Sequence, residues 1–195
     1  SSVYFISTRI LRDGGAGPTL IVSPLLALMR NQIDAAEKLE IKAETINSSN
    51  QDEWDQIKQS ILSDDIDAIL ISPERFSNEY FIEEFLQPIS DRIGLFVVDE
   101  AHCISDWGHD FRPDYRRLVN VLNQLPPNMP LLATTATANN RVLEDVENQL
   151  GDIKILKGNL KRESLSLQNI ILPDQASRLA WLAQAIPKFQ NSGIV

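Results

Sequence analysis

Short apolar runs alternate with helical patterns along most of this chain, and that alternation is the feature that most constrains its fold. Segments of helical periodicity separate the runs. Strands joined by helical crossovers form a mostly parallel sheet with helices on both faces, so the sequence predicts an α/β fold. The five predicted strands are 19–23 (TLIVS), 41–47 (IKAETIN), 67–72 (DAILIS), 94–100 (GLFVVDE) and 130–135 (PLLATT); the predicted helices between and after them are 24–39, 52–62, 78–85, 113–125 and 139–150.

The two ends of the sequence do not fit one closed α/β domain. The first eleven residues are helix-like, and no strand precedes them. Near the other end we expect a strand over 164–171, a helix over 176–189 and the start of another strand at 191–195 (NSGIV). We therefore interpret the chain as a piece of a longer protein: one domain, a connector, and the first elements of a second domain.

Composition narrows the class of protein further. No apolar run approaches the roughly 20 residues of a membrane helix, so no membrane contact is expected. The single cysteine, Cys103, excludes an internal disulfide and a multi-cysteine metal site, which fits a reducing cytoplasm. The net charge is −9, unlike that of a basic nucleic-acid-coating protein. Residues 151–195 nevertheless hold six Lys or Arg against three Asp or Glu, and a strand-gripping motor needs only local positive charge.

Two adjacent carboxylates follow the fourth apolar run, at Asp99 and Glu100, with His102 two residues further on. In an open parallel sheet, ligands bind at the carboxyl ends of the strands. There Asp99 would hold the Mg²⁺ of a bound nucleoside triphosphate, directly or through water, and Glu100 would polarise the attacking water. His102 would link this site to neighbouring motifs. A solvated turn is the ordinary alternative for a bare Asp-Glu pair, but the four apolar residues before this one favour the catalytic interpretation.

An aromatic-rich run, 103–113 (CISDWGHDFRP), follows directly. Aromatic faces combined with a guanidinium group suit stacking on unpaired bases. Packing of the Trp and Phe side chains into a core is the alternative. The residues that this reading selects are Trp107, His109, Phe111 and Arg112.

Together, the DEAH tetrad and this run resemble the RecQ family of DEAH-box, superfamily-two DNA helicases almost residue for residue. In that family the loop couples single-strand binding to ATP hydrolysis, so the resemblance implies this sensor role for Trp107, His109, Phe111 and Arg112. It also implies a RecA-like, P-loop NTPase type of sheet that is incomplete at its N-terminus.

The resemblance extends to three further segments within 19–138. Residues 19–32 look like motif Ia, in which Ser23 and Pro24 end a strand and open a helix whose amides receive a DNA phosphate, assisted by Arg30 and Gln32. Residues 72–75 look like motif Ib, which implies DNA contacts for Ser72 and Arg75. Ordinary strand-to-helix turns are the alternative for both segments.

The third segment, 134–137 (TTAT), looks like motif III, which links the hydrolysis site to strand separation. The resemblance assigns that coupling to Thr135, Ala136 and Thr137. An N-cap at Thr137 is a compatible local alternative. Beyond Ala138 the match is looser: 158–165 (GNLKRESL) occupies the place of the family's connector but departs from its pattern.

A nucleotide motor needs a glycine-rich phosphate loop with a lysine, and these 195 residues contain none. In the family that loop ends in GKS or GKT and runs into a helix much like the one expected here. Ser1 would then be the Mg²⁺-contacting hydroxyl of a truncated GKS. On this basis we expect the isolated chain to bind ATP poorly and not to hydrolyse it.

The resemblance implies a parent protein that is an ATP-dependent DNA helicase, moving 3′ to 5′, with roles in DNA repair and recombination. ATP and Mg²⁺ would be its cofactors, single-stranded and duplex DNA its partners, and the remaining helicase domains would act in cis. Residues 1–158 would form a RecA-like first domain truncated after the Walker A loop, and 159–195 the connector and first elements of the second. The resemblance places it in the cytoplasm, or in the nucleus of a eukaryote.

Two other functions remain open at the level of sequence. An RNA helicase of the DEAD/DEAH type would share the hydrolysis motif, although the aromatic loop is a RecQ feature. A non-catalytic RecA-like interaction module would keep the fold without the motor. The intact Asp99-Glu100 pair and Thr135-Ala136-Thr137 argue against such decay.

Overall fold

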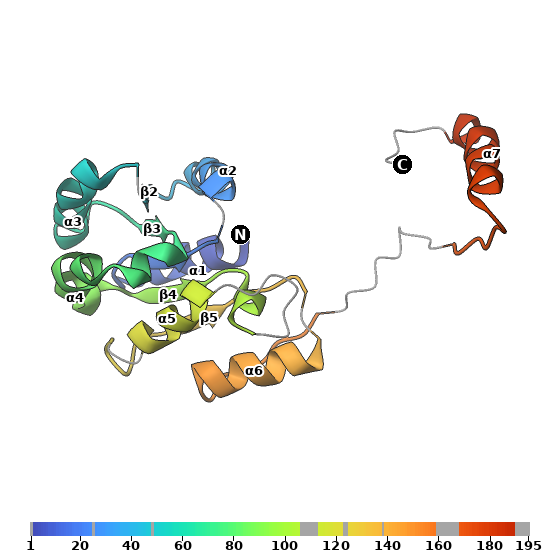
Figure 1. The fold of residues 1–195 in the computed structure, drawn as a ribbon. Coiled ribbons are helices and arrows are strands. Elements are labelled where there is room, and N and C mark those ends of the chain that lie inside the picture. The colour runs from blue at the N-terminus through green and yellow to red at the C-terminus, as the bar shows by residue number, and fades with distance from the viewer. Residues whose placement is uncertain are drawn as a thin grey trace. The chain divides into compact units, whose positions relative to one another are not determined.

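The computed structural model describes residues 2–24, 26–47, 49–105, 113–122, 125–137, 139–158 and 168–189. The chain divides into two units, Ser1–Lys154 and Ile155–Val195 (Figure 1). The first unit contains the sheet and the segments that resemble the hydrolysis and DNA-binding motifs.

Five parallel strands form one sheet in the order β2-β3-β1-β4-β5. Residues of β1, β3 and β4 are buried along their whole length, which is why these runs are almost wholly apolar. This arrangement confirms the α/β parallel-sheet prediction. The strands are β1 (Thr19–Val22), β2 (Ala43–Ile46), β3 (Ala68–Ile71), β4 (Leu95–Val98) and β5 (Leu131–Ala133).

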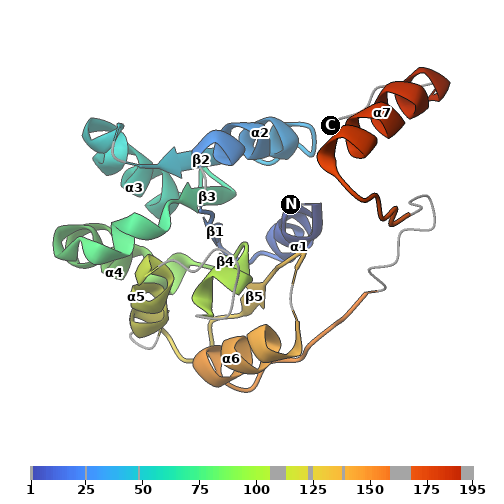
Figure 2. The ribbon, with the colours of Figure 1, turned by 45° about the vertical axis from the view of Figure 1, so that its right-hand side comes forward.

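Helices cover both faces of this sheet, and alternate strand residues face opposite layers. Leu20 and Val22 pack with the layer that holds α3, α4, α5 and α6, whereas Ile21 packs with α1 and α2. Figure 2 shows α3, α4 and α5 on one side of the strands and α1 on the other. The helices are α1 (Ser2–Asp13), α2 (Leu26–Glu37), α3 (Trp54–Leu62), α4 (Gln87–Ile89), α5 (Pro113–Leu122) and α6 (Asn140–Leu150).

The short helix expected over 78–85 differs from the prediction in type. Residues Phe81–Leu86 form a π-helical turn that continues into α4. Pro88 has no backbone N–H, so it cannot bond the carbonyl of Glu84 four residues earlier. The Lys58 ammonium donates to that carbonyl instead.

Register pairing aligns the last residues of the five strands in one row. Val22 lies opposite Ile71 and Val98, while Ile46 lies opposite Ile71 and Ala133 opposite Val98. All five strands therefore end together at the carboxyl edge of the sheet. Polar residues that directly follow these strands are brought to the same edge.

The second unit contains helix α7 (Gln175–Ala185), followed by the 3-10 turn Ile186–Lys188. Asp174 caps α7 by accepting a hydrogen bond from the Ser177 amide at 2.7 Å, and this bond holds the pKa of Asp174 below its ordinary value. Residues 168–171 do not form a strand, and the rest of the strand predicted over 164–171 lies outside the described residues, as does 191–195. Within the described part of the chain, every helix is too short or too polar to cross a membrane.

Two glycines allow a close backbone approach just before β1 and β4. The Gly94 amide donates to the Pro18 carbonyl at 2.9 Å, and a Cβ on Gly94 would overlap the backbone of Gly17. A Cβ on Gly17 would in turn overlap the carbonyl of Arg92. The lateral pairing of β1 with β4 therefore depends on the absence of side chains at this crossing.

Gly94→Ala should lower the free energy of unfolding by about 2 kcal/mol or more, because the new methyl group meets backbone that cannot rotate away. Chemical denaturation of the 195-residue chain measures this change. Gly158→Ala is the matched control, since its Cβ would have no heavy atom within 4 Å. Equal stabilities for the two variants would contradict the close approach.

Candidate functional site

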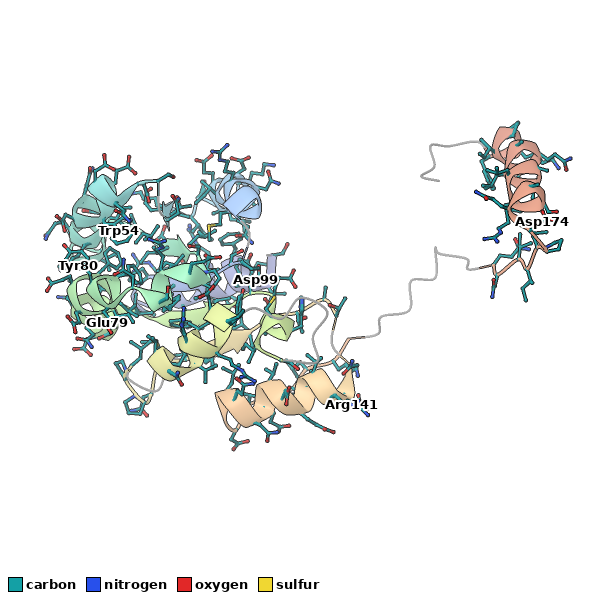
Figure 3. The ribbon with its side chains drawn as sticks, in the orientation of Figure 1. Trp54, Glu79, Tyr80, Asp99, Arg141 and Asp174 are labelled. Carbon is teal, nitrogen blue, oxygen red and sulfur yellow. The ribbon has the colours of Figure 1, made fainter. Side chains whose placement is uncertain are left out.

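Four of the polar residues at the carboxyl edge follow neighbouring strands. Ser72 follows β3, Ser23 follows β1, Asp99 follows β4 and Thr134 follows β5. Their strands are adjacent in the sheet in that order. Asp99 thus lies between the ends of β1 and β5, near the middle of the first unit (Figure 3).

The backbone of Asp99 is fixed by two hydrogen bonds from different parts of the fold. Its amide donates to the carbonyl of Val22 at 2.9 Å, which extends the ladder of β1 and β4 by one residue. Its carbonyl accepts from the hydroxyl of Tyr115, a fully buried residue of α5, at 2.8 Å. The aspartate is therefore attached both to the sheet and to the helix that follows the aromatic run.

The Asp99 carboxylate accepts hydrogen bonds from four donors. Oδ1 accepts from Thr134 Oγ1 at 2.8 Å and from the Glu100 amide at 3.1 Å. Oδ2 accepts from Tyr4 Oη at 3.2 Å and from Gln32 Nε2 at 3.1 Å. These donors come from α1, α2, the end of β5 and the adjacent peptide, so the orientation of the carboxylate is set by the whole edge of the sheet.

Glu100 has left-handed backbone angles, with φ 52° and ψ 45°. This conformation is uncommon for a residue with a side chain, and such strain persists only where the surroundings enforce it. Here the Glu100 carbonyl accepts from the Cys103 amide at 2.8 Å, and the Ala101 amide donates to the Thr134 carbonyl at 2.9 Å. The turn separates the side chains of Asp99 and Glu100 immediately after the strand.

His102 connects Glu100 to the segment after β5. The imidazole is 5% exposed, and its Nδ1 lies 3.2 Å from Glu100 Oε2 and 3.0 Å from Thr135 Oγ1. Thr135 Oγ1 also accepts from the Thr137 amide at 3.2 Å. The structure therefore brings together Glu100, His102, Thr135 and Thr137, whereas Ala136 is exposed and has no side chain able to join the network.

The N-cap of α6 is Asn139, whose side chain accepts from the Val142 amide at 3.0 Å. The alternative of a cap at Thr137 is therefore wrong. An asparagine one residue before the helix satisfies its first amides, which leaves Thr137 with Thr135.

The residues predicted to contact DNA lie in different settings. Ser23 is fully buried, and its hydroxyl has no hydrogen-bond partner among the described residues. Pro24 is buried beside it, whereas Arg30 is exposed on α2. Ser72 is 5% exposed and precedes a five-residue 3-10 turn, Pro73–Ser77, in place of the expected α-helix start.

Arg75 belongs to that 3-10 turn and is half-buried. Its guanidinium carbon lies 5.8 Å from the ring centroid of Trp54, a cation–π contact. Trp54 itself packs edge-on against Phe81 at 5.4 Å and Phe85 at 6.4 Å. The Arg75 side chain is thus held by an aromatic cluster on the layer that contains α3, away from the Asp99 carboxylate.

Several predicted site residues lie outside the described residues, namely Ser1, Trp107, His109, Phe111 and Arg112. The residues that flank 106–112 make hydrogen bonds to other elements of the first unit. Ser105 is fully buried and donates to Asp145 Oδ2 of α6 at 2.7 Å, and Tyr115 donates to Asp99 as described above. The residues that flank 106–112 are therefore held by α6 on one side and by Asp99 on the other.

Four residues that donate hydrogen bonds to Asp99 were not predicted to contact it: Tyr4, Gln32, Tyr115 and Thr134. A sequence signal existed for Gln32, which lies in the buried stripe of α2 with Met29 and Ala36. A polar residue in an otherwise apolar stripe usually has a buried partner. The sequence placed Gln32 beside DNA instead, and the structure shows it facing Asp99.

A second group of charges lies at the amino edge of the sheet, opposite Asp99. Arg12 contacts Asp67 at 2.8 Å and Asp64 at 2.6 Å, and it donates to the Ala16 carbonyl at 2.9 Å. Burial alone lowers the pKa of Arg12, but the hydrogen bonds and charges of the two aspartates outweigh it and raise that pKa. These donors are committed to protein acceptors, so the group serves to fix the turns entering β1 and β3.

Comparison with known proteins agrees with this arrangement. The chain belongs to the DEAD/DEAH box helicase family, whose family model matches residues 2–146. Curated relatives include the RecQ-like DNA helicase BLM of Xenopus laevis, 35% identical over 191 residues, and the probable ATP-dependent DNA helicase RecS of Bacillus subtilis, 37% identical over 183 residues. Each match covers 92% of this chain. The predicted resemblance to RecQ helicases is therefore confirmed.

The chain spans only a minor part of those relatives, 14% of the Xenopus protein and 36% of the Bacillus protein. Among solved structures, the DUF1998 helicase MrfA bound to DNA and AMPPNP is similar with a TM-score of 0.52 and 16% identity. That match covers 72% of this chain and 20% of MrfA. It supports the fold, which is that of RecA-like helicase domains.

Tyr115→Phe should lower the free energy of unfolding by about 1 to 2 kcal/mol, because the Asp99 carbonyl loses its buried donor. Chemical denaturation of the chain measures the loss. Tyr80→Phe removes the same hydroxyl from a side chain that is 64% exposed (Figure 3), and it should change stability by less than about 0.5 kcal/mol. An unchanged Tyr115→Phe variant would argue that this hydrogen bond does not hold the site.

Proposed function

We propose that this chain is part of the first motor domain of an ATP-dependent DNA helicase of the RecQ type, which couples ATP hydrolysis to 3′–5′ strand separation. The observation that carries the proposal is the joint position of Asp99, Glu100, His102 and Thr135 at the carboxyl edge of a parallel sheet. Acidic and hydroxyl groups at that edge suit the binding and hydrolysis of a nucleoside triphosphate.

In this proposal Asp99 holds the Mg²⁺ that accompanies ATP. A carboxylate with a fixed orientation is a suitable ligand for this cation, and Mg²⁺ keeps several of its waters in protein sites. Because Asp99 already accepts four hydrogen bonds, contact through a metal-bound water fits better than displacement of a donor. When bound, Mg²⁺ supplies neutralisation of the charge on the β- and γ-phosphates.

Glu100 orients and polarises the water that attacks the γ-phosphate. Its side chain is half-buried, and His102 lies between it and Thr135, in contact with both. A change at Glu100 therefore reaches the segment Thr135-Ala136-Thr137 through one imidazole ring. This path is the proposed link between hydrolysis and strand separation.

The proposed domain division places residues 1–158 in the first RecA-like domain and 159–195 in the connector and the start of the second. The division of the structure after Lys154 supports a boundary in this region. Ser1 is proposed as a hydroxyl that contacts Mg²⁺.

Single-stranded and duplex DNA are the proposed partners. The buried Ser23 and Pro24 favour phosphate contact through the backbone amides at the start of α2 over contact through the serine hydroxyl. Arg30 is exposed on the same helix and can reach a phosphate; Ser72 and Arg75 form the second proposed contact. Trp107, His109, Phe111 and Arg112 are the proposed base sensor.

The full-length protein should hydrolyse ATP in the presence of single-stranded DNA and respond far less to RNA of the same sequence. Glu100→Gln should reduce that turnover by roughly 100-fold or more while nucleotide binding is kept, since the amide cannot accept a proton. Steady-state ATPase assays and equilibrium binding of a fluorescent ATP analogue measure the two effects.

Glu79→Gln is the matched control, because Glu79 is exposed and lies outside the proposed site (Figure 3). Stimulation by RNA but not by DNA would favour the RNA helicase. Absence of any nucleotide-dependent activity in the full-length wild type would favour the non-catalytic module.

Trp107→Ala in the full-length protein should uncouple ATP hydrolysis from DNA. We expect DNA-stimulated turnover to fall toward the DNA-free rate, since stacking on one base contributes about 1 to 3 kcal/mol. The DNA-free rate and the melting temperature should remain close to wild type. Trp181→Ala is the control on a partly exposed tryptophan of α7, and a collapse of the melting temperature in Trp107→Ala alone would instead place Trp107 in the core.

A further inference from the structure

Gln32 is a polar residue on the buried side of α2. It is 7% exposed and lies in the stripe by which α2 packs on the sheet. Its Nε2 donates both to Tyr4 Oη at 2.8 Å and to Asp99 Oδ2 at 3.1 Å. One amide group therefore connects α2 with α1 and with the carboxylate after β4.

The orientation of this amide is fixed by chemistry. Asp99 Oδ2 can only accept when the carboxylate is ionised, so the atom of Gln32 that faces it must be the nitrogen. The carbonyl atom Oε1 is then turned away, and it is buried without a hydrogen-bond partner among the described residues. Burial of an unpartnered acceptor is costly, which indicates that the contact with Asp99 dominates the placement of Gln32.

We infer that Gln32 is a positioning residue for Asp99, holding the carboxylate for Mg²⁺ and linking it to the position of α2. This inference rests on the proposed function. It replaces the sequence-based assignment of Gln32 to a DNA phosphate, because a side chain that is 7% exposed and bonded to Asp99 does not face the surface.

The link to α2 follows from the geometry of the helix. Gln32 lies about two turns from the beginning of α2, where a DNA phosphate is proposed to bind. A hydrogen bond of 3.1 Å is lost when its atoms separate by several tenths of an ångström. A small shift of α2 on DNA binding therefore changes the number of donors on Asp99 Oδ2, and Mg²⁺ binding acts back on α2 in the same way.

The test uses Gln32→Met in the full-length protein, since methionine has a similar length but neither amide group. Binding of a fluorescent ATP analogue is titrated with Mg²⁺ at equilibrium, so that the readout does not require turnover. We expect the Mg²⁺ concentration for half-maximal binding to rise roughly 10-fold, as for the loss of a residue that orients a metal ligand. The affinity for single-stranded DNA without nucleotide should be unchanged.

Asn31→Met is the matched control, because Asn31 is the exposed neighbour on the same helix. Tyr4→Phe removes the other side-chain donor to Asp99 Oδ2, and it should raise the Mg²⁺ requirement by a smaller factor. This variant provides the test if Gln32→Met does not fold. An unchanged Mg²⁺ requirement in a folded variant overturns the inference, as does a loss of DNA affinity with normal Mg²⁺ dependence. Failure of the proposed function is distinct, since the wild type would then show no Mg²⁺-dependent nucleotide binding.

Discussion

The hydrogen bond from the Asp99 amide to the Val22 carbonyl is the contact on which the rest of the site depends. It continues the ladder between β1 and β4 one residue beyond the last strand pair, and so it places Asp99 beside the end of β1. The side-chain partners of the Asp99 carboxylate reach it from α1, from α2 and from the residue that follows β5. The two glycines at the opposite end of these strands keep that ladder closed laterally, so the amino edge of the sheet contributes indirectly to the chemistry proposed at the carboxyl edge.

The strained backbone of Glu100 is held in place by hydrogen bonds of its two neighbours, Asp99 and Ala101. Glu100 adopts left-handed backbone angles, yet its neighbours on both sides are held by β1 and by the segment after β5. That segment supplies Thr134 to Asp99 and Thr135 to His102. The turn therefore separates the two carboxylates, and the segment after β5 contacts Asp99 directly and Glu100 through His102. A shift of Thr134 and Thr135 would act on Asp99 and on His102 at once, which is a physical basis for the coupling proposed for the segment Thr135-Ala136-Thr137.

The sequence was sufficient to predict the five strands of the sheet and the α/β class. The signal was clearest for β1, β3 and β4, because a strand buried on both faces must be apolar along its length. Asp99 and Glu100 could be selected because they interrupt such a run. The partners of Asp99 could not, since Tyr4, Gln32 and Thr134 lie 95, 67 and 35 residues away and meet it only through the crossovers. The Ser-Pro pair at Ser72 predicted the start of an α-helix, but the structure contains a short 3-10 turn there. A proline in the first position is compatible with both kinds of helix, so the sequence could not distinguish them.

The alternation of faces along β4 has a consequence for the family to which this chain belongs. Leu95 and Val97 pack with α1 and α2, and Phe96 and Val98 pack with the opposite layer. Deletion of one residue within this strand would exchange the two layers and turn the next carboxylate toward the wrong set of helices. Length changes among relatives are therefore tolerable in the loops between elements but not inside β4, so the count of residues from Gly94 to Asp99 is as much a part of the site as the identity of its side chains.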